Sequence, residues 1–552
     1  MSSGGYPIKI AFCLAMLLGA AAWVMTPARV RAQSGESLSL QEEHGKQIYL
    51  KGEAEGGEII AVLGGSDLEL PASSFVCSNC HGLRGEGSKE GGLQPPAINW
   101  AALTRSQTSA LTSRERTAYD EATVARAISA GLDPAGNMLH PGMPHYKMTA
   151  TQMADLISYL KKIGGDADLD PGLSEDSIRV GAALPLSGPL SRVGEDVKAA
   201  LEAYFAEVNA QGGIYGRKIE LALEDSRGDP AGTSEATRTL VEKRGVFALV
   251  GSFEPAGSTV ANEILRRDEV PLVGPLTLSP VLPPVPNRFV FYLLPSFKDQ
   301  AGALVEFIGS DQTRPKQRPA SRLAVIHSNN EFDRDALEGL RQQVRLHWMR
   351  VVAEEGYSAG RFSAAATVQA LVEKQPDYVL FAGNGRDFSD LAREMHRRKV
   401  EAGLLTFAVL VGQASFDLPV DIAARTYLSY PTSLPQRENF EEFLGVMQRR
   451  GVELRSTAFQ ALAYAAARVF VEAAKNTTRQ INRASLIDSL EQLHDLKTGV
   501  IGPVTFGPNR RVGSAGSYIV GIDPVKKHYV VASPRIVPTV RQPSGQGTGF
   551  SE

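Results

Sequence analysis

From residue 177 onward, short apolar runs alternate with longer stretches in which apolar side chains recur every three or four residues. The runs have the length of buried strands and the stretches have the period of helices, so the pattern predicts alternating β-strands and α-helices. This order is typical of a parallel sheet with helices on both faces. The first predicted strands are 178–186, 219–224, 246–250 and 271–276, with a helix at 195–211.

The same pattern starts again after a break at 314–319 that is rich in proline and basic residues. The second series of predicted strands is 323–327, 351–355, 378–381 and 405–410. The two series therefore predict two α/β lobes that face each other across a cleft. Clefts of this kind are where proteins usually hold small ligands.

The chain before residue 165 has a different pattern, in which short amphipathic stretches are separated by irregular segments. Apolar residues at helical spacing predict helices at 41–49 and 151–163. Residues 52–74 are rich in glycine and acidic residues and predict a loop or a hairpin. This part of the chain is expected to form a small all-α domain.

Length and composition support a division into domains. The 552 residues exceed what one core usually supports, which predicts two or three domains. Glycine, proline and like charges predict an extended, solvated linker at 165–176, between domains at 33–164 and 177–535. Residues 536–552 are polar and predict a disordered tail. The net charge of −3 shows no basic excess that would favour nucleic acid.

Residues 1–32 are expected to be a signal peptide that is removed on export. Lys9 supplies a positive charge before an apolar run, and small residues at Val30 and Ala32 suit a signal peptidase. The apolar run is shorter than the ~20 residues that a membrane-spanning helix needs. The mature protein is therefore expected in a bacterial periplasm.

Cys77, Cys80 and His81 form the attachment signature of c-type haem. Two thiols at this spacing can add to the two vinyl groups of one haem, and the histidine then lies beneath the ring as an axial ligand of the iron. A zinc site would need two further ligands, and a redox dithiol would need a surrounding βαβ pattern. The only other cysteine, Cys13, lies in the predicted leader, so we expect one covalent haem c and no structural disulfide.

The segment 131–146, which contains Met143-Pro144, followed by a short helix, resembles the Met-Pro segment of class I cytochromes c. This resemblance implies that Met143 is the sixth ligand of the iron, and that a proline after the haem motif accepts a contact from the proximal histidine. His140 and His145 flank Met143 and remain alternatives, since a neutral imidazole also binds iron. Met148 is a further candidate for the sixth ligand, because its thioether sulfur can also bind iron.

Three stretches resemble type I periplasmic binding proteins of the leucine/isoleucine/valine class, which serve ABC transporters. They are Ala-Ala-Leu-Pro-Leu-Ser-Gly-Pro at 182–189, Asn-Ala-Gln-Gly-Gly-Ile-Tyr-Gly-Arg-Lys at 209–218 and Glu-Asp at 224–225. Residues 502–509 resemble the closing hairpin of that family. The resemblance covers about residues 177–531 and implies a two-lobed ligand-binding fold.

The expected ligand site departs from that family. The serine that binds the ligand's carboxylate in amino-acid receptors falls on Pro255, which has neither a hydroxyl nor a backbone donor. Ser252, Ser258 and Thr277 lie nearby and are the candidate cleft residues, although ordinary cap or loop roles would also account for them. The departure favours an apolar or aromatic ligand over a simple amino acid.

No catalytic motif accompanies these features, so we expect no enzyme. The first functional hypothesis is an exported electron carrier whose second domain binds a small molecule or a redox partner, such as a periplasmic dehydrogenase or another cytochrome. The second is a solute receptor for an ABC permease, with the haem as a redox sensor. A haem peroxidase is the third, and it would need an open iron position that a Met143 ligand denies.

Overall fold

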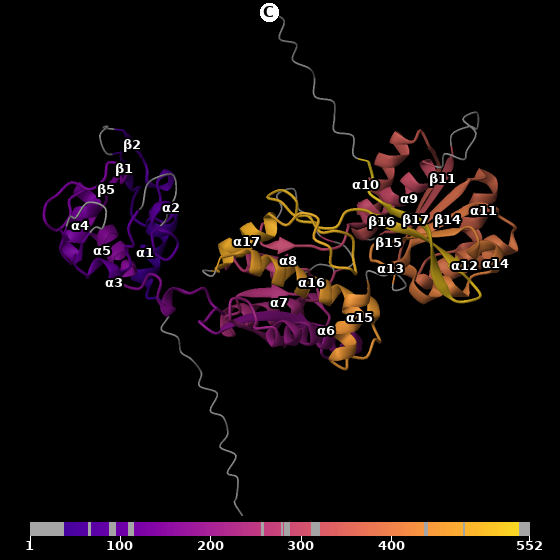
Figure 1. The fold of residues 1–552 in the computed structure, drawn as a ribbon. Coiled ribbons are helices and arrows are strands. Elements are labelled where there is room, and N and C mark those ends of the chain that lie inside the picture. Colours follow the sequence, from indigo (N-terminus) through magenta and orange to yellow (C-terminus); the bar gives the residue numbers. More distant parts are fainter. Residues whose placement is uncertain are drawn as a thin grey trace, which may run out of the picture. The chain divides into compact units, whose positions relative to one another are not determined.

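The structure, a computed structural model, describes residues 38–63, 68–87, 95–108, 115–255, 259–277, 280, 287–310, 321–329, 331–434, 440–478 and 481–539 (Figure 1). The chain divides into two compact units. The first consists of residues 1–77 and 100–163, and the second of residues 78–99 and 164–552. The predicted leader lies outside the described residues.

The first unit is built around the close packing of its first and last helices, α1 (Leu40–Lys51) and α5 (Ala150–Leu160). A Cβ atom on Gly45 would lie 2.1 Å from the carbonyl oxygen of Asp155, so only glycine allows this approach. Capping boxes begin both helices, which confirms the two predicted helices of this region. The remaining helices are α3 (Trp100–Leu103) and α4 (Glu121–Ala130).

The helical fold expected for this unit is present, and a small antiparallel sheet is added to it. Strands β1 (Ile60–Val62) and β2 (Glu69–Pro71) form the hairpin that the sequence allowed, and β1 also pairs with β5 (His145–Lys147) in an antiparallel sheet. A shorter pair joins β3 (Gln107–Thr108) and β4 (Glu115–Arg116). The sheet arises because the inserted hairpin offers β5 a partner strand that is distant in sequence.

The larger unit contains the two predicted α/β lobes. Lobe 1 has a parallel sheet in the order β10-β9-β8-β6-β7. Its strands are β6 (Ser177–Leu184), β7 (Lys218–Asp225), β8 (Ala248–Val250), β9 (Leu272–Val273) and β10 (Val290–Phe291). Its helices are α6 (Ser191–Ala210), α7 (Pro230–Arg238), α8 (Thr259–Arg267), α15 (Glu441–Arg449), α16 (Thr457–Asn476) and α17 (Arg483–Glu491).

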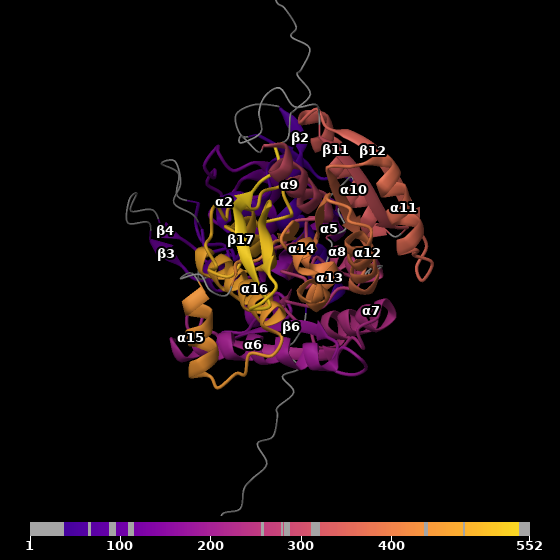
Figure 2. The same ribbon diagram turned by 90° about the vertical axis from the view of Figure 1, so that its right-hand side faces the viewer.

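Lobe 2 has a seven-stranded sheet in the order β12-β11-β13-β14-β15-β16-β17, in which the last two pairings are antiparallel. Its strands are β11 (Arg322–Ser328), β12 (Arg350–Tyr357), β13 (Tyr378–Ala382), β14 (Gly403–Phe407), β15 (Thr426–Tyr430), β16 (Ser517–Asp523) and β17 (His528–Ile536). Its helices are α9 (Phe297–Gly309), α10 (Glu331–Leu346), α11 (Ala364–Lys374), α12 (Gly385–Arg397), α13 (Ala408–Val411) and α14 (Val420–Ala423). Helices α9 and α10 pack on each other, as Figures 1 and 2 show.

The predicted strands of both series are present. The main difference is at 405–410, where the strand ends at Phe407 and α13 begins at Ala408. The chain leaves lobe 1 after β10, returns to it after β15, and leaves it again after α17. Each lobe is therefore completed by segments that are far apart in sequence.

The connector, residues 164–176, is folded, in contrast to the expected extended linker. A 3-10 helix spans Asp166–Asp168, and the side chain of Asp168 accepts a hydrogen bond from the backbone N–H of Gly164 at 3.0 Å. Asp170 accepts one from the backbone N–H of Arg483 at 2.6 Å. A Cβ on Gly172 would lie 2.2 Å from the backbone nitrogen of Phe247, so the chain runs directly against lobe 1 there.

The described end of the chain is also packed. Strand β17 includes Ile536, and Gln343 on α10 donates a hydrogen bond to the carbonyl of Thr539 at 2.8 Å. Residues 536–539, expected in the tail, thus lie against lobe 2, while 540–552 lie outside the described residues. Among the helices that the structure describes, none combines the length and apolar character required to cross a membrane.

Candidate haem site and ligand edge

The short helix α2 (Cys77–His81) carries the predicted haem motif. Residues three apart on a helix share a face, so Cys77 and Cys80 project from the same side of α2. Cys77 is half-buried and Cys80 is exposed. Two cysteine side chains one turn apart on a helix are the arrangement that double thioether attachment requires.

His81 is the buried end of this helix, with 8% of its surface exposed. Its Nδ1 lies 2.9 Å from the carbonyl oxygen of Pro96, and because a carbonyl only accepts, Nδ1 carries the proton and donates. Nε2 therefore keeps its lone pair, as an imidazole ligand of a metal needs. Burial lowers the pKa of His81, although the bond to Pro96 opposes this effect. Pro96 is the proline contact that the sequence could not assign.

These residues fit a covalently attached haem. The loop after α2 is fixed by hydrogen bonds from Gly87 to the carbonyl of His81 at 2.8 Å and from Ile98 to the carbonyl of Gly85 at 2.7 Å. These bonds hold the segment that supplies the Pro96 carbonyl. Within the described residues, no group of three or more His, Cys, Asp or Glu side chains could hold a bare metal ion.

The candidates for the sixth ligand of the iron lie close together in the sequence, between residues 140 and 148. Met143 is half-buried, and its backbone N–H donates to the carbonyl of His140 at 2.9 Å. The exposed His140 ring accepts a hydrogen bond from Gly142 through Nδ1 at 3.0 Å. The ring of His145 lies against Gly131, since a Cβ there would be 2.1 Å from Nε2. Met148, also half-buried, follows β5. Met143 as the ligand stays a prediction.

In lobe 1, the ligand edge is the set of residues that follow the carboxyl ends of β6 to β9, where open α/β sheets bind ligands. Ser252 is 2% exposed, and its hydroxyl accepts a hydrogen bond from the backbone N–H of Ala183 at 3.1 Å. Thr277 is half-buried, and its N–H donates to the carbonyl of Pro275. Ser258 lies outside the described residues.

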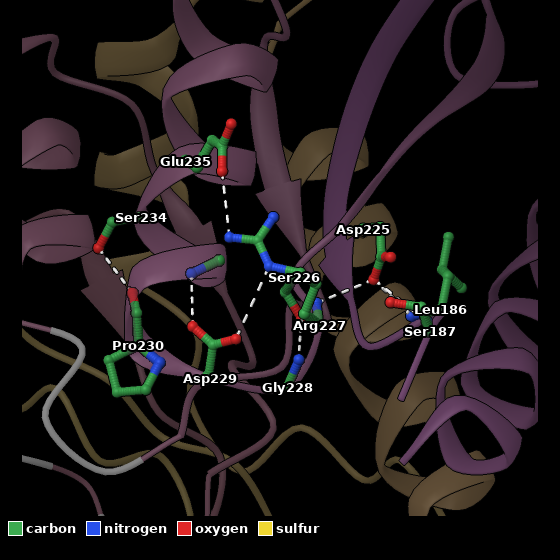
Figure 3. A network of polar contacts seen from close by, with 11 residues as sticks. Leu186, Ser187, Asp225, Ser226, Arg227, Gly228, Asp229, Pro230, Ser234 and Glu235 are labelled. Carbon is green, nitrogen blue, oxygen red and sulfur yellow. Dashed lines mark hydrogen bonds and ion pairs between the residues drawn. The ribbon is translucent and has the colours of Figure 1, made fainter. Parts of the chain in front are cut away.

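Asp225, at the end of β7, is held by backbone donors (Figure 3). One of its carboxylate oxygens, Oδ1, accepts hydrogen bonds from the N–H groups of Leu186 at 2.9 Å, Ser187 at 3.2 Å and Arg227 at 2.8 Å. Burial opposes ionisation of this carboxyl, yet the hydrogen bonds hold its pKa below the usual range. This carboxylate organises the loops at the ends of β6 and β7.

Glu254 is a group on this edge that sequence reasoning missed. It is 6% exposed, and its Oε1 has no hydrogen-bond partner among the described residues. Burial raises its pKa to about 8. The signal in the sequence was an acidic residue between Phe253 and Pro255 at the end of a buried strand, a pattern that belongs to no familiar motif.

Two family models match the chain: a periplasmic binding protein model over residues 177–528 and a cytochrome c model over residues 72–164. Fold and motif thus define a two-lobed α/β binding protein preceded by a helical cytochrome c region. The chain belongs to the periplasmic binding protein family, and its relatives are Leu/Ile/Val-binding proteins. This fold and these relatives indicate a binding role.

Leu/Ile/Val-binding protein BraC3 of Rhizobium johnstonii is 21% identical over 336 residues, which is 61% of this chain and 89% of that protein. Other Leu/Ile/Val-binding relatives are matched over only 58–60% of their own length. Among solved structures, a branched-chain amino acid ABC transporter protein from Thermus thermophilus with bound valine has a TM-score of 0.52 at 15% identity, covering 66% of this chain and 97% of that one.

A fatty acid ABC transporter substrate-binding protein from Thermomonospora curvata also has a TM-score of 0.52 at 15% identity, covering 67% of this chain and 94% of that one. Proteins of this one fold thus include one with bound valine and one named for fatty acids. The likeness establishes the fold of this chain and leaves its ligand open.

Proposed function

We propose that this protein is an exported, periplasmic c-type cytochrome that transfers single electrons and carries a solute-binding domain of the ABC-transporter type. The haem domain would span residues 33–164 and the binding domain residues 177–535, with residues 1–32 removed on export. Its partners would be a small apolar or aromatic ligand, a redox protein such as a periplasmic dehydrogenase or cytochrome, and an ABC permease. No enzymatic role is proposed.

The observation that carries this proposal is the buried His81 ring, which is oriented by the Pro96 carbonyl at 2.9 Å. This bond fixes both the tautomer and the direction of the ring, so that Nε2 is the nitrogen offered to iron. Cys77 and Cys80 would hold the ring system covalently. A haem bound here would supply a one-electron iron couple, whose potential a Met143 thioether would raise.

Covalent attachment is tested on denatured protein. We expect one haem per chain to survive acid–acetone extraction of the wild type, because both cysteines of the motif attach to it. Cys77→Ala with Cys80→Ala should release all of the haem, whereas Cys13→Ala should leave the mature protein unchanged. Complete extraction of the wild-type haem would refute the proposal.

The sixth ligand is tested by a matched pair of variants. Ferric wild-type protein should show the weak sulfur-to-iron charge-transfer band of thioether ligation. Met143→Ala should abolish this band and Met148→Ala should preserve it. If His140→Ala or His145→Ala changes the low-spin spectrum instead, the ligand is an imidazole.

A second candidate function, a solute receptor whose haem segment senses redox state, is favoured by the folded connector. The guanidinium of Arg84, in the loop after the haem motif, donates to the carbonyl of Gly164. The other end of the connector is fixed through Asp170 and Arg483. Because the connector is held at both ends, a change at the haem loop can alter the free energy of lobe 1.

Redox coupling is measured as the melting temperature of the binding domain in the oxidised and the reduced protein. We expect a difference between the two states that disappears in Arg84→Ala, because this variant removes the contact to Gly164. Lys147→Ala, which removes an exposed ion pair with Glu69, is the control. Identical melting in both redox states of the wild type would leave the electron carrier as the better candidate.

A further inference from the structure

A side-chain hydrogen bond in the first unit joins the segment that carries Cys77 to the segment that carries Met143. The hydroxyl of Tyr146 on β5 donates to the carbonyl oxygen of Phe75 at 2.6 Å. Tyr146 is 6% exposed, so water competes little for this bond. Phe75 precedes Cys77 by two residues. Tyr146 follows Met143 by three residues, so one bond connects both segments of the predicted haem site.

The inserted hairpin supports the same connection through the backbone. Its strand β1 is the central strand of the small sheet, with β2 on one side and β5 on the other. Strand β2 ends at Pro71 and leads through a 3-10 helix at Ala72–Ser74 to Phe75. On the other side of β1, the buried Ala61 pairs with Tyr146. Backbone and side chain therefore both hold β5 to the chain that enters the haem motif.

The chain between Tyr146 and Met143 is short and stiff. Three residues of fully extended chain span at most about 11 Å, so Met143 stays near Tyr146 as long as β5 is in place. Pro144 has a fixed φ and restricts the conformation of the residue before it. The backbone N–H of Met143 also donates to the carbonyl of His140 at 2.9 Å. A displacement of the whole turn that carries Met143 therefore acts directly on the Tyr146 bond.

Such a displacement would matter because other groups that bind iron are close to Met143 in the sequence. His140 is exposed and His145 is half-buried. Imidazole from solution carries the same ring. Each of these can take the sixth position once a thioether has left it. A protein that transfers single electrons through a six-coordinate iron needs this exchange to be suppressed.

We propose that Tyr146 is a positioning residue of the haem site, whose hydrogen bond to Phe75 keeps Met143 on the iron and other ligands off it. Tyr146 acts through the segment that carries Met143 and does not itself bind the iron. The inference rests on the proposed c-type cytochrome with Met143 as the sixth ligand. It goes beyond that assignment by naming what keeps the site closed, and a closed site lacks the open iron position that a haem peroxidase needs.

The test titrates the full-length ferric haem protein with imidazole. Imidazole binds only where Met143 has left the iron, so its apparent dissociation constant is the intrinsic constant divided by the open fraction. A nitrogen lone pair replaces a sulfur lone pair, and the iron stays ferric. Tyr146→Phe deprives the Phe75 carbonyl of its hydroxyl donor and should raise the open fraction. We expect the imidazole midpoint, measured by loss of the sulfur-to-iron band, to fall by about fivefold or more.

Two control variants separate this role from the loss of a hydroxyl group and from the loss of stability. Tyr215 in lobe 1 also donates its hydroxyl to a backbone carbonyl, that of Lys475 at 2.6 Å. Tyr215→Phe should therefore keep the wild-type midpoint. Ile48→Val trims a buried side chain of α1, so it should lower the melting temperature of the haem domain without moving the midpoint.

Hydrogen exchange of the wild type gives a second measurement that needs no variant. Saturation with imidazole displaces Met143 from the iron and should loosen the connection through Tyr146. We therefore expect faster exchange of the β5 amides in the imidazole adduct, and unchanged exchange of the β6 amides in lobe 1. This measurement decides the question even if Tyr146→Phe fails to fold.

The failures of the two proposals are distinguishable. If ferric wild type shows no sulfur-to-iron band, Met143 is not the ligand and the inference fails with it, while covalent attachment is judged by the extraction test. If the band is present, three results would each refute the role of Tyr146 and leave the cytochrome standing. They are a wild-type midpoint in Tyr146→Phe, an equal shift in Ile48→Val, and β5 exchange that imidazole does not change.

Discussion

His81 and Glu254 are both titratable side chains with almost no exposure to solvent, yet their surroundings differ. The Nδ1 of His81 donates to a backbone carbonyl, whereas the Oε1 of Glu254 has no hydrogen-bond partner among the described residues. Burial favours the neutral form of both groups, which lowers the pKa of the imidazole and raises that of the carboxyl. The same physical cause therefore acts in opposite directions on a base and an acid.

The two groups differ in what fixes the orientation and the charge of the side chain. The bond to Pro96 fixes the orientation of the His81 ring, so its free nitrogen is preorganised for iron. The Oε1 of Glu254 has no such bond, so burial alone favours its neutral form. One group is oriented by a hydrogen bond, and the other is held neutral by burial.

Replacing His81 is expected to have the largest effect. His81→Ala removes the proximal nitrogen, so the six-coordinate low-spin spectrum should be lost completely even though the thioether bonds remain. His396→Ala is the control, because His396 is an exposed histidine on α12 of lobe 2, where its ring pairs with Asp421 at 2.6 Å. Absorption and electron paramagnetic resonance spectra measure the spin state. A low-spin spectrum in His81→Ala would mean that another residue is the proximal ligand.

Replacing Glu254 should alter the dependence of stability on pH. The carboxyl has a pKa of about 8 in the folded protein and about 4.5 when unfolded, so the folded state binds more protons between these values. Stability therefore falls as pH rises from about 4.5 to about 8. The titratable neighbour that senses its charge, Tyr292, has a pKa raised above its usual value, chiefly by burial, and does not titrate in this window.

Glu254→Gln removes this loss of stability. The variant should match the wild type near pH 4 and exceed it above pH 8 by at most roughly 4–5 kcal/mol, since each pKa unit corresponds to about 1.4 kcal/mol. Urea unfolding of the binding domain across this pH range measures the difference. Glu220→Gln, which replaces an exposed residue of the same lobe, should follow the wild-type curve. Parallel curves for wild type and Glu254→Gln would show that Glu254 is solvated.

Much of the fold followed from the sequence. Buried parallel strands such as β6 and β11 appear as continuous apolar runs, and the haem motif is recognisable because attachment demands a fixed spacing. The connector was misjudged, because its anchor Arg483 lies 313 positions after Asp170 and composition carries no such long-range information. Glu254 was missed for a related reason: tertiary burial sets its charge state.

Arg483, whose backbone N–H binds Asp170 of the connector, also tests how strongly a half-buried side chain stabilises this part of lobe 1. Its side chain donates to the carbonyls of Phe247 at 3.0 Å, Asp268 at 3.0 Å and Val246 at 2.8 Å. Arg483→Ala leaves these three acceptors unpaired and should destabilise the binding domain by about 3 kcal/mol. The exposed Arg266 gives the control, and Arg266→Ala should stay within about 0.5 kcal/mol of wild type. Equal urea midpoints for both variants would mean that the three hydrogen bonds of the Arg483 side chain do not stabilise lobe 1.

Ser252 gives the smallest expected effect and the sharpest contrast with Glu254, from which it is separated by only one residue. Its hydroxyl accepts the N–H of Ala183 at 3.1 Å inside lobe 1. Ser252→Ala removes one hydrogen bond and should reduce stability by about 1 kcal/mol. Affinity for a bound solute should stay within a factor of two, because the hydroxyl binds the backbone at the β6–β8 junction. A tenfold loss of solute affinity in Ser252→Ala would show that the hydroxyl contacts the solute instead.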